Sequence, residues 1–434
     1  MRKKASQLTA YLLVFILACG LSFGQINKKD TEGISLQQAV EEALSNNDIL
    51  QAAHQKVEST LASLRKARGN FLPNIDANFN YSRLDIVPGF KKIVLGNIQN
   101  DFFTFLSIQQ PLYTGGKLTQ SKKKAEAAVE AQNYSFQSDQ LNVKLAVTLL
   151  YYQLISLNNE MKILQENRRQ LEVQEQYSRL LVQSGHMSEL ELNRIKVELA
   201  QIDGSILRAE NDYITVSNDL SVILGRVEPA ALFPADSLEL KPLGINPEAL
   251  LPTALDHNPL LNKFEWDIHQ AESNVYIKKA ARLPQISALA WYGYEFGPES
   301  FSLGKNDRYF LGLTARMPVF DGGVISADIT QAESQLGQVK EYQEYLLKNI
   351  QTQLHNLYLK LEEMKKQTKI QEQAVDQAEK TYRLALIEYH AGRRSNTDLL
   401  DIQKSLLNSR LQLNKAVVKY NKSKAELMYA LGIL

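Results

Sequence analysis

The residues of this chain best placed to do chemistry are two carboxylates near its C-terminal end, Asp398 and Asp401. They are three residues apart in a segment with a helical pattern of apolar residues, so both lie on one face of a helix. Carboxylates on one face could attract cations or act as an acid and a base. Acids are also common in the first turn of a helix, where the helix dipole favours them. Taken alone, the pair is interpreted as a capping residue and a solvated surface charge.

The rest of the chain gives no support to an enzyme or a cofactor-binding protein. It has 434 residues and one cysteine, which excludes an internal disulfide and a thiolate zinc site. Its six histidines include no pair four residues apart, and it has neither a phosphate-binding loop nor a plausible catalytic triad. A net charge of +1 argues against nucleic-acid binding. We expect no cofactor and no metal. Because the chain has no energy-converting motif, any energy that its function requires must come from a partner.

The two carboxylates belong to the second copy of an internal duplication. Each copy has a helical stretch that reaches a lone glycine, Gly185 or Gly392, and these glycines are 207 residues apart. In each copy a second helix then begins. It ends at a Leu-Gly pair, whose glycine is Gly225 in the first copy and Gly432 in the second. The predicted repeats are residues 34–228 and 246–434, joined by a proline-rich linker over 229–245. The two tip turns are near residues 185 and 392.

Each repeat contains two predicted strands and two long predicted helices. Apolar and polar residues alternate in hairpins over 75–112 and 286–319, which predicts one apolar and one polar face. Each hairpin ends in Pro-x-x-x-Gly-Gly, a turn back into helix; these joints contain Pro111, Gly115, Gly116, Pro318, Gly322 and Gly323. Residues 112–228 and 319–434 contain no proline, and helices of nearly seventy residues would be about 100 Å long. The opening segments, Ile34 to about Gly69 and Asn246 to Arg282, are each predicted to be one helix.

The N-terminus is predicted to be an export signal. A basic head is followed by an apolar stretch that is too short to span a membrane, and residues 1–24 form a signal peptide if cleavage follows Gly24. The alternative is a lipoprotein box ending at Cys19, which would leave that cysteine lipidated. After residue 25 no run of about eighteen apolar residues occurs.

Four amphipathic strands cannot close a barrel by themselves, and lipid does not tolerate open sheet edges. The sequence therefore predicts an oligomer in which several chains each contribute four strands around a polar pore. The long helices would continue this pore away from the membrane. The predicted fold class is mainly α with a small β part.

The duplicated pattern, the Pro-x-x-x-Gly-Gly joints and the glycine tips resemble the TolC family of outer-membrane efflux channels, from Ser35 to Gly432. The resemblance implies a homotrimer with a 12-stranded β-barrel in the lipid of the cell outer membrane and an α-helical barrel in the periplasm. It also implies a periplasmic adaptor (a membrane fusion protein) and an inner-membrane pump such as an RND or ABC transporter.

The resemblance also assigns roles at the tips. By position, Asp398 and Asp401 correspond to the aspartates that narrow the family's bore, where six carboxylates from three chains would favour cations. Tyr389 and Arg394 correspond to latch residues on the second tip, and Glu191 to their acidic partner on the first. The function this implies is a passive exit duct, gated at the tips. The alternative is a periplasmic coiled-coil scaffold or adaptor without a pore.

Overall fold

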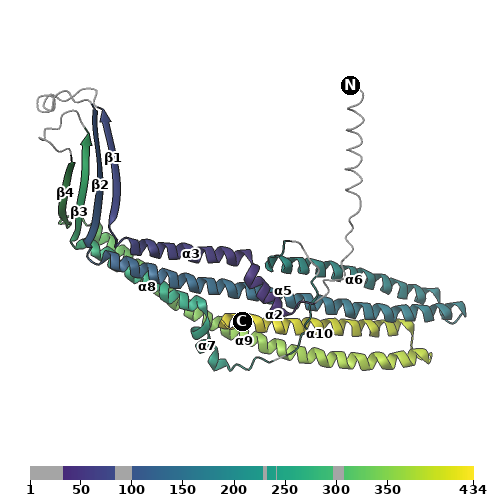
Figure 1. The fold of residues 1–434 in the computed structure, drawn as a ribbon. Helices are drawn as coiled ribbons and strands as arrows, with labels where there is room; N and C mark the ends of the chain where they lie inside the picture. The colour runs from purple at the N-terminus through teal and green to yellow at the C-terminus, as the bar shows by residue number, and fades with distance from the viewer. Residues whose placement is uncertain (1–32, 84–99, 228–231, 241, 297–306) are drawn as a thin grey trace, which may run out of the picture.

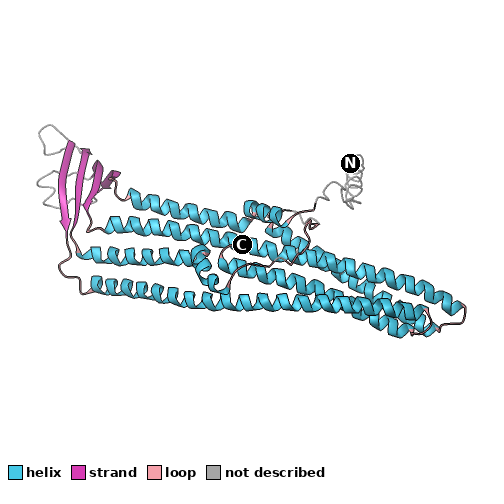
Figure 2. Ribbon diagram, turned by 90° about the horizontal axis from the view of Figure 1, so that it is seen from below, coloured by secondary structure: helices cyan, strands magenta, loops and turns pink. Residues whose placement is uncertain are grey.

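The chain folds into a long helical rod with a small β-sheet at one end (Figures 1 and 2). The computed structural model describes residues 33–83, 100–227, 232–240, 242–296 and 307–434. The predicted signal peptide and Cys19 lie outside these residues. The C-terminus lies partway along the rod, whereas the turns between the long helices form the end opposite the sheet (Figure 1).

Two helices of 67 residues run the length of the rod, α5 (Lys117–Gln183) and α9 (Val324–His390). Each would be about 100 Å long at 1.5 Å per residue. Helix α6 (Glu189–Ile223) returns along α5, and α10 (Asn396–Leu431) returns along α9. The α9–α10 hairpin also contacts the α5–α6 hairpin, mainly through α10 and α5.

The opening segment of each repeat is broken into two helices, so the predictions of one continuous helix are wrong. The first repeat has α2 (Leu36–Asn46) and α3 (Asp48–Gly69). The second has α7 (Leu250–His257) and α8 (Pro259–Lys279), flanked by the short 3₁₀ turns η1 (Pro247–Ala249) and η2 (Ala280–Arg282). The breaks occur at Asn47 and Asn258, which adopt extended backbone conformations and cap the helix that follows.

The same two asparagines hold each broken segment against the end of the returning helix. The side-chain amide of Asn47 donates to the Ile223 carbonyl at 2.8 Å, and that of Asn258 donates to the Ala430 carbonyl at 2.9 Å. The returning helices end beside these contacts at Gly225 and Gly432, which are left-handed at φ 76° and 80°. Each repeat thus closes on itself near the middle of the rod.

Part of the linker is attached to the same region. Ile34 forms a parallel β-bridge with Pro234, and the Asp236 carboxylate accepts hydrogen bonds from the Leu36 amide and the Tyr151 hydroxyl, at 2.7 and 2.8 Å. Burial is the main cause that raises the Tyr151 pKa. A tyrosine that stays protonated is the donor that the carboxylate requires.

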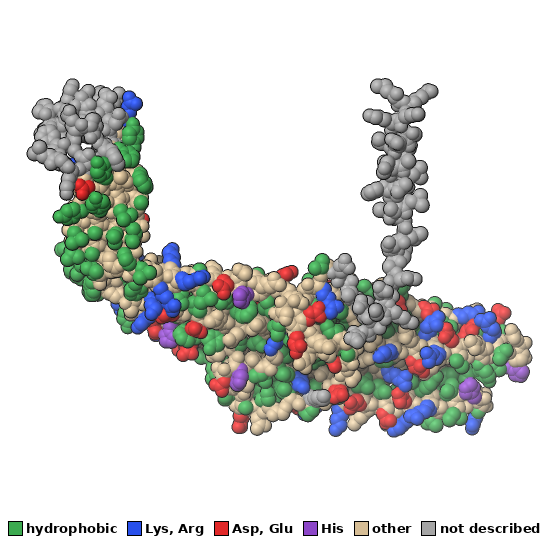
Figure 3. Space-filling view, viewed as in Figure 1, with side chains coloured by type: hydrophobic (Ala, Val, Ile, Leu, Met, Phe, Trp, Pro, Cys, Tyr) green, Lys and Arg blue, Asp and Glu red, His purple; other side chains and the backbone are tan. Residues whose placement is uncertain are grey.

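The sheet contains four antiparallel strands in chain order: β1 (Asn74–Arg83), β2 (Asn100–Tyr113), β3 (Gln285–Phe296) and β4 (Asp307–Arg316). The two hairpins join through β2 and β3, so β1 and β4 are edges without a partner strand among the described residues. Hydrophobic side chains cover the strands on the face seen in Figure 3, whereas charged side chains are spread over the rod.

The register separates the sheet into two faces. Ile75, Leu106, Tyr292 and Leu311 lie on one face, which is apolar as predicted. Asp76, Asn78 and Ser107 lie on the other, but this face also carries four aromatic side chains: Phe103, Phe105, Trp291 and Phe310. The prediction of a uniformly polar second face is therefore wrong. Leu289 and Trp291 lie at alternate positions of β3 on this face, whereas the equivalent positions of β1 carry polar residues.

The buried core follows the rod as separate clusters. One contains Val147, Tyr151 and Leu220 of the first repeat, and its counterpart contains Leu354 and Leu427 of the second. In the part of the chain that the structure describes, no helix combines the length and apolarity needed to cross a membrane.

Candidate functional site: the helix tips

The two helical hairpins turn in the same way at the end of the rod away from the sheet. Helix α5 is followed by Gly185 at φ 73°, and α9 by Gly392 at φ 70°. In each turn a serine then caps the returning helix: the Ser188 hydroxyl accepts from the Glu191 amide, and the Ser395 hydroxyl accepts from the Asp398 amide at 3.1 Å. The two tips are thus equivalent in backbone geometry and differ in their side chains.

Asp398 and Asp401 lie in the first two turns of α10, and both side chains are exposed. Their spacing puts them on one side of the helix. Among the described residues, neither carboxylate has an ion-pair partner. The two carboxylates are therefore placed to meet solvent or a neighbouring surface rather than the core of the chain.

Tyr389 is buried between the two hairpins. Only 8% of it is exposed, and its hydroxyl lies 3.3 Å from that of Ser178 on α5. Its ring packs edge-on against Tyr177 with centroids 6.2 Å apart. Burial is the main cause that raises the Tyr389 pKa, and the Glu191 charge contributes. The neutral hydroxyl thus shares a hydrogen bond with Ser178 that ties α9 to α5.

Arg394 is paired within its own hairpin. Its guanidinium lies 2.7 Å from the Glu388 carboxylate on α9. Glu191 takes part in the tip through its backbone, because its carbonyl accepts from the Asn396 side chain at 3.3 Å. Among the described residues of one chain, neither Tyr389 nor Arg394 forms a hydrogen bond or ion pair with the Glu191 carboxylate, and the predicted latch between neighbouring helix pairs stays a prediction.

Asn396 is the tip residue that the sequence interpretation missed. It is 2% exposed, and its side-chain oxygen accepts from the Gln174 amide at 2.7 Å while its nitrogen donates to Glu191. A third link runs from the Arg194 guanidinium to the Thr397 hydroxyl at 2.8 Å. Asn396 therefore touches α5 and the start of α6 from the first turn of α10. We call the contacts of Gln174, Asn396 and Glu191 the tip clasp.

A small apolar cluster lies beside the tip clasp. Leu399 is 1% exposed, packs with Tyr389 and Ala385, and meets Met187 of the first tip turn. A hollow of about 350 Å³ opens next to it between α5 and α9, bordered by Tyr177, Tyr382 and His390 among others. The two tips are thus held together by few apolar residues and several polar contacts.

Farther from the tip, the interface between the hairpins contains an unsatisfied amide. Gln403 of α10 is 2% exposed, and neither atom of its amide has a hydrogen-bond partner among the described residues. It borders a second hollow of about 350 Å³ between α5, α6 and α10. An unpaired buried amide weakens the packing of α10 on the first hairpin.

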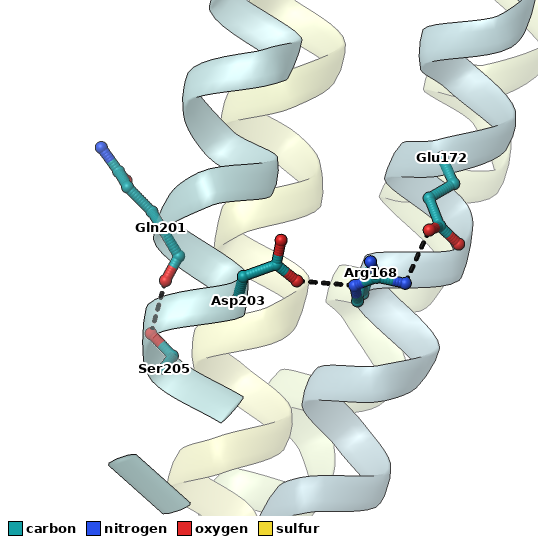
Figure 4. A network of polar contacts seen from close by, with 5 residues as sticks. All are labelled: Arg168, Glu172, Gln201, Asp203 and Ser205. Carbon is teal, nitrogen blue, oxygen red and sulfur yellow. Dashed lines mark hydrogen bonds and ion pairs between the residues drawn. The ribbon is translucent and has the colours of Figure 1, made fainter. Parts of the chain in front are cut away.

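The first hairpin itself is bridged by the network in Figure 4. Arg168 of α5 lies 2.6 Å from Asp203 on α6 and 2.6 Å from Glu172 on its own helix. The hydrogen bond to Asp203 is the main cause that raises the Arg168 pKa. These groups are exposed, so the network orients α6 more than it stabilises it.

The joints between sheet and helices also repeat. Gly115, Gly116, Gly322 and Gly323 all have φ between 61° and 88°, and Gly116 and Gly323 begin α5 and α9. Pro111 does not end its strand: β2 continues to Tyr113, with a register shift after Pro111 that accommodates the proline. Pro318 lies in the loop after β4. In the second joint the Asp321 carboxylate accepts hydrogen bonds from the backbone amides of Ile325 and Gly323, and the bond from Ile325 is the main cause that lowers the Asp321 pKa.

Comparison with known proteins matches both repeats of the chain to the same protein family. Residues 39–226 and 250–433 match the protein-family model described as outer membrane efflux protein. The pyoverdine export outer membrane protein OpmQ of Pseudomonas putida is 24% identical over 424 residues, with 92% of this chain and 85% of that protein covered. The alkaline protease secretion protein AprF of Pseudomonas aeruginosa is 22% identical, over 94% of this chain and 86% of that protein.

The fold is also found among solved structures. The crystal structure of the CmeC outer membrane channel of Campylobacter jejuni matches with a TM-score of 0.81 at 19% identity, covering 92% of this chain and 85% of that one. At this identity the match establishes the fold, and the residues of the tips have to be interpreted from their own geometry.

Proposed function

The chain belongs to the outer membrane efflux protein family, and on that premise we propose that three copies form the exit duct of a tripartite efflux or secretion system. The family and its structural neighbours are channels, and the chain is located in the outer membrane with a periplasmic extension. The duct is passive and is gated at the helix tips. We further propose that residues 1–24 are removed on export and that the repeats 34–228 and 246–434 are joined by the linker 229–245.

One observation carries this proposal: at the end of a helical rod about 100 Å long stands a sheet whose two edges have no partner strand within the described part of the chain. Strand β1 has ten residues and β4 has ten, the length that a tilted membrane strand needs. Lipid does not tolerate an open edge, so β4 of one chain must pair with β1 of another. Three chains give a closed barrel of twelve strands.

The side chains support the same arrangement. Tyr309 and Leu311 are each 83% exposed on the apolar face, and Leu313 is 73% exposed. Exposed aliphatic and aromatic side chains on one face of a sheet are favourable in lipid and costly in water. The opposite face, with Asp76 and Asn78, then lines the pore.

The tips supply the gate. The exposed Asp398 and Asp401 would form a ring of six carboxylates when three α10 helices meet, and such a ring favours cations. The tip clasp and the hydroxyl contact of Tyr389 oppose separation of the two hairpins, and the Arg394–Glu388 pair holds the turn of the second hairpin. A periplasmic adaptor and an inner-membrane pump, of the RND or ABC type, would open this gate and supply the driving force.

The relatives differ in cargo. One is named for pyoverdine export and another for secretion of an alkaline protease. A duct whose polar face serves such different cargo needs no enclosed binding pocket and no catalytic group. We therefore propose a channel without enzymatic activity.

The test is ion conduction by the purified full-length protein in a planar lipid bilayer. The proposal predicts a small, cation-preferring single-channel conductance from a detergent-solubilised trimer. A monomeric, water-soluble product that does not insert would support the alternative, a periplasmic scaffold or adaptor. If a well-folded trimer conducts nothing, a variant with a loosened tip, Asn396→Ala, distinguishes a sealed gate from the absence of a pore.

A further inference from the structure

Basic side chains gather on the first repeat where the rod meets the sheet. They lie at the end of α3 and at the start of α5, two helices that pack side by side. They are Arg65, Lys66, Arg68, Lys117 and Lys122–Lys124. The same two stretches, 65–69 and 117–126, contain a single acid, Glu126. Lys and Arg side chains are visible at this junction in Figure 3. This end of the chain therefore carries a surplus of positive charge.

Some of these bases are held by neighbouring groups. The Glu126 carboxylate lies 3.5 Å from Arg68 on α3 and 3.5 Å from Lys122 on its own helix. Lys124 donates a 2.9 Å hydrogen bond to a side chain of α8, on the other side of α5. Successive residues of a helix are turned by about 100°. Lys123, which lies between Lys122 and Lys124, therefore points out of the layer of helices.

Other bases have no partner for their side chains among the described residues. Arg65, Lys117 and Lys123 are exposed and form neither an ion pair nor a side-chain hydrogen bond there. Lys66 is unpaired as well, but it is two residues from the buried Leu64 and so faces the edge of α3 that a neighbouring chain would cover. We call Arg65, Lys117 and Lys123 the basic belt.

The nearest acids do not neutralise the basic belt. Glu58 and Glu130, on the same two helices, lie seven residues farther from the sheet than Arg65 and Lys123, or about 10 Å. Asp76 belongs to the sheet face opposite the apolar one. At the joint of the second repeat, by contrast, two bases of α8 pair with acids of α9 at 2.9 and 2.8 Å. The surplus charge is thus confined to α3 and α5.

Helix electrostatics explain only part of the basic belt. The helix dipole favours a base near the C-terminal end of a helix, which accounts for Arg65 on α3. Lys117 is the first residue of α5, where the dipole disfavours a positive charge. The positions of α9 that are equivalent to Lys117 and Lys123, 207 residues later, hold Val324 and Thr330. The lysines of α5 therefore need another explanation.

The apolar face of the sheet ends beside the basic belt. Tyr113, the last residue of β2, is 46% exposed and pairs with Ile286, so it lies on the apolar face four residues before Lys117. Ten-residue strands with a membrane tilt cover an apolar band about 25 Å tall, and the headgroup layer beyond it is roughly 5–8 Å deep. Lys123 is about 9 Å along α5, within reach of this layer for a long side chain.

We propose that the basic belt binds the headgroups of anionic phospholipids in the membrane leaflet nearest the rod. This inference rests on the proposed function, which places the apolar face of the sheet in lipid. Unpaired cations just outside an apolar band attract anionic headgroups, and an aromatic side chain at the same depth, here Tyr113, is typical of a membrane interface. Three chains give three such belts, which hold the barrel at one depth in the bilayer.

The test places a tryptophan at the end of the apolar face. The chain has two tryptophans, so a variant with Trp266→Phe, Trp291→Phe and Tyr113→Trp reports on this place alone. The full-length variant is placed in nanodiscs of phosphatidylcholine and phosphatidylglycerol, with one of the two lipids brominated in its acyl chains. Brominated lipid quenches a tryptophan that it touches. A Trp266→Phe variant keeps Trp291, on the opposite face of the sheet, as the matched reporter.

The first step tests the orientation of the sheet. We expect brominated phosphatidylcholine to quench the Tyr113→Trp reporter more than it quenches Trp291. Stronger quenching of Trp291, or no quenching of the Tyr113→Trp reporter, would overturn the proposed function and the basic belt with it.

The second step compares the two lipids. Each cation that contacts a headgroup should favour the anionic lipid by up to about fivefold at low salt, so brominated phosphatidylglycerol should quench the Tyr113→Trp reporter at a lower mole fraction than brominated phosphatidylcholine. This preference should shrink in about 1 M salt, which screens the charges. Lys117→Gln with Lys123→Gln should lower the preference by about two- to fivefold. Lys366→Gln with Lys369→Gln, which changes two exposed lysines of α9 far from the sheet, should leave it unchanged.

Correct orientation with equal quenching by the two lipids would overturn the basic belt as a lipid site and leave the proposed function intact. Equal effects of the two lysine pairs would overturn it too. If the lysines of α5 face the bore instead, Lys117→Gln with Lys123→Gln would raise the cation preference of the channel and leave the lipid preference unchanged, which also contradicts the proposal. Should Lys117→Gln disturb the start of α5, Arg65→Gln with Lys123→Gln removes two cations of the same belt and is expected to lower the lipid preference in the same direction.

Discussion

The side-chain amide of Gln174 donates a 2.7 Å hydrogen bond to the side-chain oxygen of Asn396, and both residues are buried where the two helical hairpins meet. The donor is on α5 and the acceptor is in the first turn of α10, so the bond joins the two repeats. Because Asn396 also donates to the Glu191 carbonyl, one residue fixes the second tip to both helices of the first.

Asn396→Ala should loosen the tip. It leaves the buried amide of Gln174 and the Glu191 carbonyl without their partner, at a cost of about 1–3 kcal/mol. We expect a larger single-channel conductance and greater sensitivity of cells to a large antibiotic such as vancomycin. The matched control is Asn414→Ala on the same helix, which loses a bond to Ser156 far from the tip. Equal effects of the two variants would show that the tip clasp has no special role.

The latch can be assigned by comparing partners of Arg394. Its guanidinium is 2.7 Å from Glu388 within the second hairpin, whereas the family resemblance implies a bond to Glu191 on a neighbouring helix pair. If the pair with Glu388 holds the gate, Glu388→Gln should raise conductance as much as Arg394→Ala does, and Glu191→Gln should not. The opposite order would support the latch to Glu191. Unchanged conductance in all three variants would remove Arg394 from the gate.

The carboxylates of α10 should set ion selectivity. Asp398→Asn combined with Asp401→Asn removes six negative charges from a trimer, so the preference for cations should fall. The reversal potential in a salt gradient measures this preference. Asp376→Asn, an exposed acid that pairs with Lys380 on α9, is the control and should change nothing. Unaltered selectivity in the double variant would place Asp398 and Asp401 outside the constriction.

The repeats, strands and long helices could be predicted because their signals are local and occur twice. The absence of proline predicted two long helices, which have 67 residues each, and the alternation of apolar and polar residues predicted where both β-hairpins lie. The break at Asn47 was missed because an asparagine is tolerated within a helix, and its cap is supported by the carbonyl of Ile223, 176 residues away. Pro259 marks the equivalent break in the second repeat and could have indicated the first.

The contacts of the tips could not be predicted in this way. Asn396 follows the capping Ser395 and looks like an ordinary polar residue, since its partners Gln174 and Glu191 are more than 200 residues away. The aromatic side chain of Trp291, in contrast, left a signal. Trp291 alternates with the apolar-face positions of β3, so its place on the opposite face follows from counting along the strand.

The joint before α9 should respond to pH through Asp321. Amide donors lower its folded-state pKa below the value of an unfolded chain, so its contribution to stability is present above the unfolded pKa, near 4, and is lost as the pH falls through the folded pKa. The difference in thermal midpoint between the wild type and Asp321→Ala should therefore be largest at neutral pH and shrink in acid. Thr114→Ala alters the equivalent cap of α5, which has no charge, and its effect should not depend on pH. A constant difference for Asp321→Ala would exclude an ionised cap.

The glycines that end the two repeats should be required for stability in a way that a mid-helix glycine is not. Gly225 is left-handed at φ 76°, and a Cβ there would collide with the backbone carbonyl of Asn46. Gly225→Ala should therefore destabilise the fold by about 1–3 kcal/mol, seen as a lower midpoint of thermal unfolding.

Gly204 provides the opposite case within the returning helix α6. It is exposed, and a Cβ at this position would meet nothing within 4 Å. Gly204→Ala should stabilise the protein by about 0.5–1 kcal/mol, because alanine loses less backbone entropy in a helix. Changes of the same sign in both variants would contradict the explanation, since it attributes the loss at Gly225 to its left-handed conformation and its contact with Asn46 rather than to glycine content.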